Sequence, residues 1–337
     1  MFLTQQSLAA QSSQVFVEAQ VQASSAPVSI DDFINDWEGS LTSSGDYAFA
    51  DGRLRTGIAL KGWEMAVEKR WHYDLRFSPD TAKLYYNIEN KVADDQKYDL
   101  NLNVKMIHAE GISFAKTLQF NHLTIKPEFT FYRSDYYQLG QLTGSASGDI
   151  ANKDNIAIEV DLNDYHFRED KILEDPRIGG DGYGISVNLT AAYENDQWLF
   201  YTRVDDLYSQ WQFTDSVYLN GKVCVYFSGG SGNCTGGGGK SGVENYTDSL
   251  GHSLSSTVLY KPIGVSAHAY VHGRYQRVGL QKDWQTVAGK LGASIYSTQQ
   301  LGLHWQSKWH RLALLLDHYE IKQAHHAQVD LAITIPW

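Results

Sequence analysis

The sequence has no long apolar segment and no excess of basic residues. None of its apolar runs approaches the roughly 18 residues that a membrane-spanning helix needs, which excludes a helical membrane protein. The formal net charge of −11 is opposite in sign to what nucleic acid binding requires, so no nucleic acid partner is expected. Residues 1–10 have neither the basic region nor the apolar core of a complete secretory signal.

Aromatic residues and alternating patterns are what the sequence has instead. Tyrosine occurs 21 times and tryptophan 9 times, a surplus that fits the aromatic girdles of a transmembrane barrel. Residues 63–77 alternate with a period of two, as in a β-strand with two different faces. One face carries Trp63, Met65, Val67, Trp71, Tyr73, Leu75 and Phe77, the other carries Glu64, Glu68, Arg70, His72, Asp74 and Arg76, and Lys69 is the only break. A barrel would turn the first face to lipid and the second to an aqueous lumen, whereas a soluble sandwich would bury the first face and expose the second.

The same alternation recurs from about residue 45 to the end of the chain. Polar connections near 138–154, 168–182 and 228–252 predict long loops at one rim of a barrel, with short turns at the other rim. The stretches 138–154 and 168–182, however, flank a single obvious strand. Long and short connections therefore do not alternate there as a barrel with an even number of strands requires.

The carboxyl-terminal residues carry the strongest pattern. Val329, Leu331, Ile333, Ile335 and Trp337 alternate with Gln328, Asp330, Ala332, Thr334 and Pro336, and the sequence ends on an aromatic residue. This pattern resembles the closing strand of bacterial outer-membrane β-barrels, although Pro336 removes one ladder N–H. The resemblance implies an all-β, transmembrane, antiparallel up-and-down barrel over residues 45–337, with about 14 strands (12–16). It also implies a bacterial outer-membrane location, contact with outer-membrane lipid, and recognition of the last strand by the barrel assembly machinery.

Residues 1–44 form a separate amino-terminal part in this interpretation. Residues 1–28 are rich in Gln, Ser and Ala and are expected to be a tail. Ile30, Phe33, Ile34 and Trp37 have helical spacing behind Ser29, a suitable N-cap. The predicted short helix would either cover the mouth of the barrel on the periplasmic side or enter the lumen with the tail as a constriction.

The inward-facing side chains are the candidate functional residues. Those predicted to line the lumen are Glu64, Glu68, Arg70, His72, Asp74, Arg76, Lys105, Glu159, Asp161, Arg203, His268 and Arg274, with Tyr132, Tyr201 and Tyr270 as aromatic platforms. Their mixed signs predict salt-bridged walls. Such a wall suits neutral polar solutes, and it equally suits a water-filled pore without preference.

Within the barrel class, the length and the segment ahead of the barrel resemble monomeric saccharide-uptake porins of the cyclodextrin and oligosaccharide diffusion type. That resemblance implies passive diffusion of neutral oligosaccharides, such as cyclodextrins or maltooligosaccharides, through a monomer without a cofactor. Two alternatives remain open: a barrel enzyme that hydrolyses lipid or peptide, and a structural or adhesive barrel. Because the sequence has no compact catalytic signature, no enzymatic activity is expected.

The spacing of the histidines and cysteines along the chain indicates which metal sites and disulfides are possible. His268 and His272 share one strand face, but residues four apart on a strand are separated by about 13 Å, too far for one metal ion, so no metal site is expected. Cys224 and Cys234 enclose a short loop, and two cysteines in an envelope protein most simply form one disulfide. Just ahead of them, Asn220-Gly221 predicts a two-residue hairpin turn.

Overall fold

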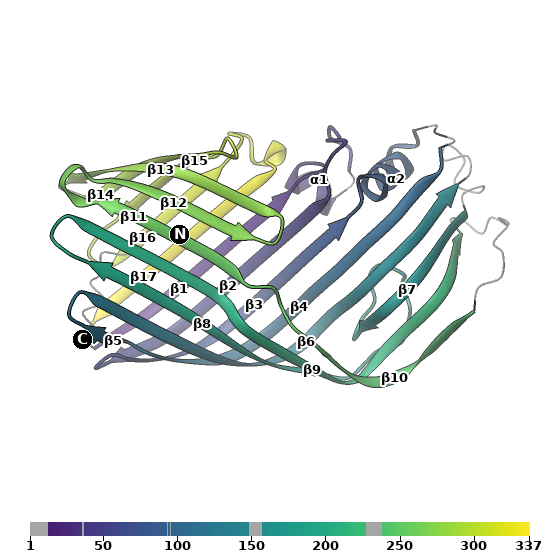
Figure 1. Ribbon diagram of the computed structural model, residues 1–337, viewed down its shortest axis with the longest axis horizontal. Helices are drawn as coiled ribbons and strands as arrows, with labels where there is room; N and C mark the ends of the chain where they lie inside the picture. Colours follow the sequence, from purple (N-terminus) through teal and green to yellow (C-terminus); the bar gives the residue numbers. More distant parts are fainter. Residues whose placement is uncertain (1–12, 36, 93, 95, 148–156, 227–237) are drawn as a thin grey trace.

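Antiparallel β-strands form a closed barrel in the computed structural model (Figure 1), which describes residues 13–35, 37–92, 94, 96–147, 157–226 and 238–337. The strands are β1 (Gln14–Ser25), β2 (Tyr47–Leu60), β3 (Trp63–Phe77), β4 (Tyr98–Lys116), β5 (Leu118–Phe120), β6 (Leu123–Ser147), β7 (Ala157–Phe167), β8 (Gly182–Glu194), β9 (Trp198–Tyr226), β10 (Gly239–Asp248), β11 (Ser253–Tyr260), β12 (Val265–His272), β13 (Tyr275–Thr286), β14 (Gly289–Tyr296), β15 (Leu301–Gln306), β16 (His310–Leu316) and β17 (His326–Pro336). The connections contain the helices α1 (Ile30–Ile34) and α2 (Pro79–Asn90) and short 3₁₀ turns at Lys261–Ile263 and Ile321–Gln323. Neither described α-helix is long and apolar enough to cross a membrane.

Three positions of the barrel wall each hold two strands in series. β7 and β8 both pair with β6 on one side and β9 on the other. β4 and β5 share a position beside β6, and β10 and β11 share one beside β9. Seventeen strands therefore fill fourteen positions of a closed antiparallel barrel, which confirms the predicted fold and strand number.

The segment 168–181, between β7 and β8, explains why long and short connections did not alternate in the sequence. The backbone N–H of Gly179 donates to the carbonyl oxygen of Arg168 at 2.8 Å, and that of Thr214 in β9 donates to the carbonyl oxygen of Asp181 at 3.0 Å. The two ends of the segment are thus held together and to the neighbouring strand. The chain leaves the wall and re-enters it in the same direction, so this segment is an excursion within one barrel position and not a rim loop.

The two rims of the barrel differ in the length of their connections. Residues 61–62, 195–197 and 287–288 form short connections at one rim, whereas α1 and α2 lie in long connections at the other. The described ends of the chain meet at the short-turn rim, where the backbone N–H of Trp337 donates to the carbonyl oxygen of Ser13 at 2.9 Å. In bacterial barrels the short turns face the periplasm.

The outward side chains form an apolar belt. On β17 and the residue that follows it, the outward side chains Val329, Leu331, Ile333, Ile335 and Trp337 are exposed by 36%, 45%, 43%, 56% and 74%. The alternate residues from Gln328 to Thr334 are buried, which confirms the predicted sidedness of the closing strand. An exposed apolar surface this extensive is unfavourable in water and is satisfied by lipid.

Above the belt, a helix covers the same outward face of β3. Leu75 and Phe77 are buried there in an apolar cluster with Ile88 of α2. The hydroxyl of Ser78 caps α2 by accepting the N–H of Thr81, and Pro79 occupies the first turn. This part of the wall therefore extends beyond the belt and is shielded from water by protein.

The predicted boundary at residue 44 is wrong. Residues 14–25 are strand β1, which pairs along its whole length with β17 and β2 and closes the barrel. Its outward residues Val15, Val17 and Val21 are 44%, 42% and 51% exposed, as on neighbouring strands. The strand was missed because Phe16 is apolar on the inward face and Ala19 is small on the outward face, so the alternation is weak.

The helix after β1 is shorter than predicted and is not a constriction. α1 begins at Ile30, and Ser29 is its N-cap, as predicted, because the Ser29 hydroxyl accepts the N–H of Asp32. Phe33 stacks on Phe77 with ring centroids 6.5 Å apart, on the outward side of β3, and pairs with Trp37 at 5.1 Å. Ile34 is 74% exposed. The helix lies at the long-loop rim, against the outward face of the wall, so the predicted cover of the periplasmic mouth is also wrong.

The cysteine prediction lies partly outside the described residues, because these do not include Cys234. The disulfide with Cys224 therefore stays a prediction. The hairpin predicted at Asn220-Gly221 is wrong, since β9 continues through both residues. Gly221 supports this path with a φ of 108°, a conformation that other residues rarely adopt.

Candidate lumen site

The inward face of β3 carries ionisable side chains that water hardly reaches. Glu68, Arg70, His72 and Asp74 are 4%, 2%, 2% and 8% exposed, whereas Val67 on the other face is 54% exposed. The alternation in the sequence thus separates lipid-facing from lumen-facing residues as predicted. Burying so many ionisable groups is costly unless each finds partners.

Arg55 of β2 is the centre of one group of ion pairs. Its guanidinium lies 2.7 Å from Glu128 of β6, 2.9 Å from Glu64, 3.2 Å from Glu68 and 3.2 Å from Glu18 of β1. One cation on β2 therefore holds four carboxylates from three other strands, β1, β3 and β6, which do not all neighbour one another. Removing it would leave these carboxylates facing each other in a poorly hydrated space.

A second group joins β2 and β3 to β9. Arg70 bonds both carboxylate oxygens of Asp206, at 2.9 and 2.6 Å, and also reaches Asp51 at 3.2 Å. Arg53 lies 3.0 Å from Asp205 and 3.2 Å from Asp51. Because β3 and β9 are not neighbours in the wall, the Arg70–Asp206 pair crosses the lumen.

A β-bulge in β9 aims both aspartates inward. The register between β8 and β9 shifts between Val187 and Leu189, which leaves extra residues on β9. Asp206 adopts a left-handed φ of 53°, which Asp tolerates better than most residues. Its N–H donates to the side-chain oxygen of Asn188 at 2.8 Å, which fixes the bulge. Regular alternation would have turned one of the two carboxylates towards lipid.

Arg203 connects the two groups. Its guanidinium is 2.7 Å from Asp205 in the second group and 3.5 Å from Glu128 in the first. Neutral residues complete the hydrogen bonding: Asn188 donates to Glu128 at 2.7 Å, and Tyr132 donates to Glu68. We call these connected residues the lumen network: Glu18, Asp51, Arg53, Arg55, Glu64, Glu68, Arg70, Glu128, Arg203, Asp205 and Asp206.

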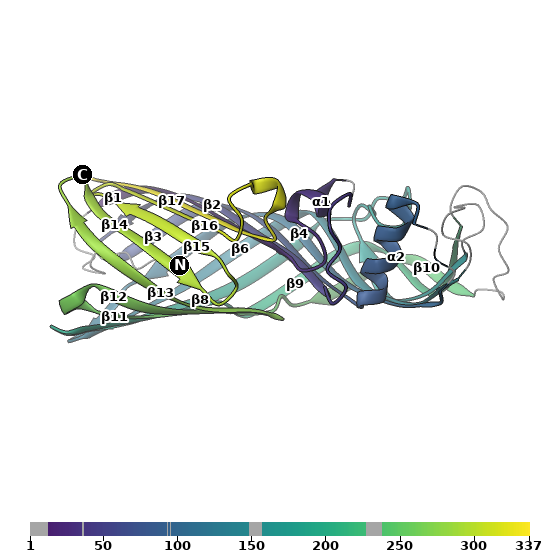
Figure 2. The same cartoon turned by 90° about the horizontal axis from the view of Figure 1, so that it is seen from above.

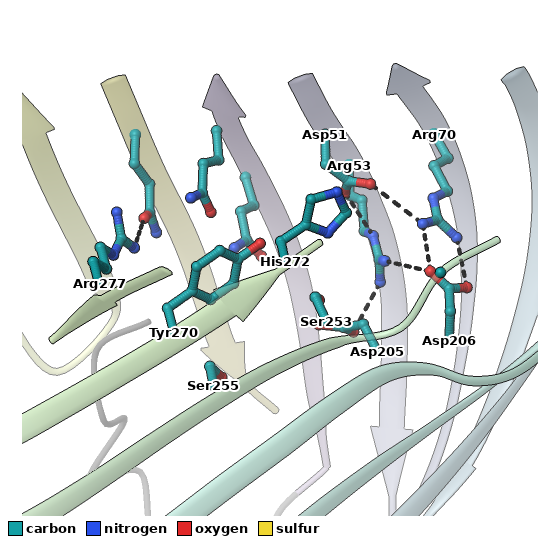
Figure 3. Close-up of a pocket in the computed structure, with 14 residues that line it drawn as sticks. Asp51, Arg53, Arg70, Asp205, Asp206, Ser253, Ser255, Tyr270, His272 and Arg277 are labelled. Carbon is teal, nitrogen blue, oxygen red and sulfur yellow. Dashed lines mark hydrogen bonds and ion pairs between the residues drawn. The ribbon is translucent and has the colours of Figure 1, made fainter. Parts of the chain in front are cut away.

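The opposite half of the lumen, formed by β12–β17, carries mainly neutral polar and aromatic groups. His268 bonds Thr257 and Ser266, each at 2.9 Å. Arg277 lies among tyrosine rings and donates to neutral oxygens, and no carboxylate oxygen of the described residues lies within 4.0 Å of its nitrogen atoms. Figure 3 shows the two halves: Arg53 and Arg70 with their aspartates on one side, Arg277 and Tyr270 on the other, and His272 between them.

The two walls touch across the lumen. The ring centroid of Phe49 in β2 is 4.7 Å from that of His272 in β12 and 5.2 Å from that of Tyr275 in β13, half a turn around the barrel. Figure 2 shows the flattened barrel, with β1, β2 and β17 in one wall and β9, β11 and β12 in the other. Between the walls remains a cavity of about 30 Å³, lined by residues of both halves. This is the space of about one water molecule.

Most predicted lumen residues point inward. Those within the barrel are Glu64, Glu68, Arg70, His72, Asp74, Tyr132, Tyr201, Arg203, His268 and Tyr270. Nearer the long-loop end, Arg76 pairs with Asp74 at 2.8 Å, Lys105 with Asp248 at 2.8 Å, and Glu159 with Lys222 at 3.3 Å. Asp161 lies two residues further along β7. Arg274 is wrongly placed by the prediction: its side chain is 53% exposed in the turn after β12, where it pairs with Asp46.

Several central residues were missed. Arg53 and Arg55 follow Asp51 at every second position of β2, a pattern that could have been recognised as a lumen face. Asp206 could not, because its bulge breaks the alternation. Among the described residues, no three His, Cys, Asp or Glu side chains are grouped to hold a metal ion.

Comparisons with known proteins add a likeness of shape. The sequence matches no protein-family model and no curated protein. A monoaromatic hydrocarbon channel, the TodX deltaS2S3 mutant, is 12% identical with a TM-score of 0.47, over 97% of this chain and 91% of that one. The Pseudomonas putida toluene transporter TodX is 11% identical with a TM-score of 0.42, over 96% and 88%. The Escherichia coli outer membrane protease OmpT is 6% identical with a TM-score of 0.21, over 98% of each chain. Similarity at this level decides neither substrate nor activity.

The structure of the barrel indicates in which membrane the protein lies. A closed sheet leaves no unpaired edge, and its outward belt is apolar, the arrangement by which β-structure crosses a bilayer. Such barrels occur in the outer membrane of bacteria, and this protein is an outer-membrane β-barrel.

Proposed function

We propose that the protein is a passive diffusion channel of the bacterial outer membrane for small polar solutes, closed in this conformation by the lumen network. The observation that carries the proposal is the Arg70–Asp206 pair, at 2.6 Å, which joins non-adjacent strands across the lumen. Ionisable residues at membrane depth are costly and typically line solute or ion pathways.

A lumen that is filled only to stabilise the barrel would not need buried ion pairs. Replacing buried ion pairs by apolar residues of similar volume is often neutral or stabilising. Arg53, Arg55 and Arg70, all less than 10% exposed, are therefore better explained by a lumen that becomes hydrated. Rotation of a few long side chains would separate the pairs without moving the barrel wall.

The space available favours small solutes over the predicted oligosaccharides. The lumen cavity measures about 30 Å³. Sites for drug-sized ligands are about 300–1,000 Å³. An oligosaccharide would require many network pairs and the Phe49–Tyr275 contact to separate together, whereas an ion or a small polar molecule needs only local rearrangement.

Single-channel recording in planar bilayers tests the proposal. Wild-type protein should show a low conductance, and Arg70→Ala should raise it several-fold, because the longest bridging side chain is removed. Asp206→Asn, which keeps the volume, should raise it less. Arg274→Gln, at the exposed rim, is the matched control and should leave the conductance at the wild-type value.

The outcomes separate the alternative functions. Folded wild-type and Arg70→Ala proteins that both fail to conduct would contradict a channel and favour a structural barrel. Block of the wild-type current by maltooligosaccharides would instead support a channel for oligosaccharides. Hydrolysis of lipid or peptide by the wild-type protein would favour the barrel enzyme, so the absence of enzymatic activity stays a prediction.

A further inference from the structure

Arg277 of β13 differs from the other buried arginines of the lumen. Its side chain is 3% exposed, and its Nη atoms donate to neutral oxygens: Gln300 at 3.1 Å, the Tyr275 hydroxyl at 3.3 Å, and Gln328. Its Nε is buried without a hydrogen-bond partner among the described residues. The guanidinium therefore has an unused donor at a wall of the lumen cavity.

Aromatic rings surround this cation. The guanidinium carbon lies 5.1 Å from the ring centroid of Tyr270, 5.1 Å from that of Tyr296 and 5.8 Å from that of Tyr275. Cation–π contacts partly replace the lost hydration, but they do not neutralise the charge. Tyr270 and Arg277 both border the cavity, so one side of this aromatic box is open to it (Figure 3).

Asp330 is linked to Arg277 only through Gln328. Gln328 accepts from Arg277 and donates to Asp330 at 2.7 Å. On the other side of the cavity, Asp51, Asp205 and Asp206 already contact Arg53 and Arg70 at 2.6–3.2 Å. The Nε of Arg70 also lacks a hydrogen-bond partner among the described residues, but the charge of Arg70 is balanced by Asp51 and Asp206. The cavity thus has arginines paired with carboxylates on one side and, on the other, an arginine with a free donor and no direct carboxylate partner among the described residues.

We propose that Arg277 binds a small monovalent anion of halide size in the lumen. The cavity of about 30 Å³ admits one ion and no large organic anion. The Nε–H donates to the anion, while Gln300, Gln328 and the tyrosine hydroxyl keep the guanidinium in place. Within the proposed channel function, on which this consequence rests, the site gives a preference for anions over cations.

Bromide tests the site directly, without requiring conductance. Crystals of the full-length folded protein grown in sodium bromide should show an anomalous peak at the Arg277 guanidinium. Arg277→Gln should abolish this peak, Arg277→Lys should retain one, and Arg274→Gln should leave it unchanged. Absence of a peak at Arg277 in the wild type, or a peak that survives in Arg277→Gln, would overturn the proposal.

Solution measurements keep the proposal testable if one variant fails to fold. The excess ³⁵Cl line width caused by detergent-folded wild-type protein should fall several-fold in Arg277→Gln and rise in Asp330→Asn, because the latter removes the competing negative charge. Equal line widths in all three proteins would contradict an anion site at Arg277. Binding without any conductance would instead contradict the channel function and leave the site standing, whereas conductance without binding would do the reverse.

Discussion

The two halves of the lumen stabilise their buried polar side chains in different ways. In the half formed by β2, β3, β6 and β9, arginines lie against carboxylates, with shortest distances from 2.6 Å for Arg70–Asp206 to 3.0 Å for Arg53–Asp205. In the half formed by β12–β17, neutral groups bond one another, as His268 does with Thr257. An ion pair there, Lys290 with Asp283 at 2.6 Å, lies towards the short-turn rim.

This difference indicates where the lumen can change most easily. A buried ion pair that loses one partner leaves an uncompensated charge, whereas a neutral hydrogen bond that breaks leaves a group that a water molecule can satisfy. The charged half is therefore strongly specified as a unit, and its arginines share carboxylate partners. The neutral half tolerates local change, and it contains Arg277, which borders the lumen cavity without a direct carboxylate partner among the described residues.

The largest effect is expected from Arg55→Met. Loss of the guanidinium leaves Glu64, Glu68 and Glu128 without their common cation, and the folded barrel should lose about 3–5 kcal/mol of its free energy of unfolding. Equilibrium denaturation of the protein refolded in lipid vesicles measures this loss. Arg274→Gln, at the exposed rim, should cost less than about 1 kcal/mol.

The comparison would fail if Arg55→Met and Arg274→Gln had the same stability. That result would mean that water already screens the carboxylates around Arg55, and that the charged half is as easily rearranged as the neutral half.

A smaller effect is expected from His268→Phe in the neutral half. The substitution keeps an aromatic ring but leaves the hydroxyls of Thr257 and Ser266 without their shared partner, at a cost of about 1–3 kcal/mol. Denaturation under the same conditions measures the cost, and His268→Gln should recover part of it. A loss equal to that of Arg55→Met would show that the neutral half is specified just as tightly.

The sequence predicted the barrel because its main signal is periodic. Strands with a clean period of two, such as β3 and β17, were assigned to the correct face throughout, since lipid and lumen select opposite side chains at adjacent positions. β1 was missed where Phe16 and Ala19 weaken that contrast. The strand number of fourteen followed from the count of alternating runs and turns. The shared position of β7 and β8 did not, because an excursion looks like a rim loop in sequence.

From the sequence, some of the residues that line the lumen could be predicted, but the ion pairs between them could not. Glu68 and Arg70 were recognised as lumen residues, yet neither partner, Arg55 nor Asp206, was. Pairs across a lumen join strands far apart in sequence, so spacing carries no information about them. The bulge at Asp206 depends on a backbone conformation that opposes the local alternation, and the contrast between the two halves appears only once the sheet is closed.

The smallest effect concerns an ion pair outside the lumen. Lys69 of β3 and Glu110 of β4 pair at 3.2 Å on the outward face, with side chains 45% and 67% exposed. Lys69 is also the residue that broke the alternation in the sequence. If the pair lies in the aqueous or headgroup region, a double-mutant cycle with Lys69→Gln and Glu110→Gln should give a coupling of about 0.2–1 kcal/mol that high salt reduces. A coupling well above this range and insensitive to salt would mean that the pair is immersed in hydrocarbon, because lipid neither screens nor solvates charges. A small, salt-sensitive coupling would place the edge of the apolar belt on the long-loop side between Val67 and Lys69. It would also give the coupling energy of an exposed pair, with which the buried pairs of the lumen network can be compared.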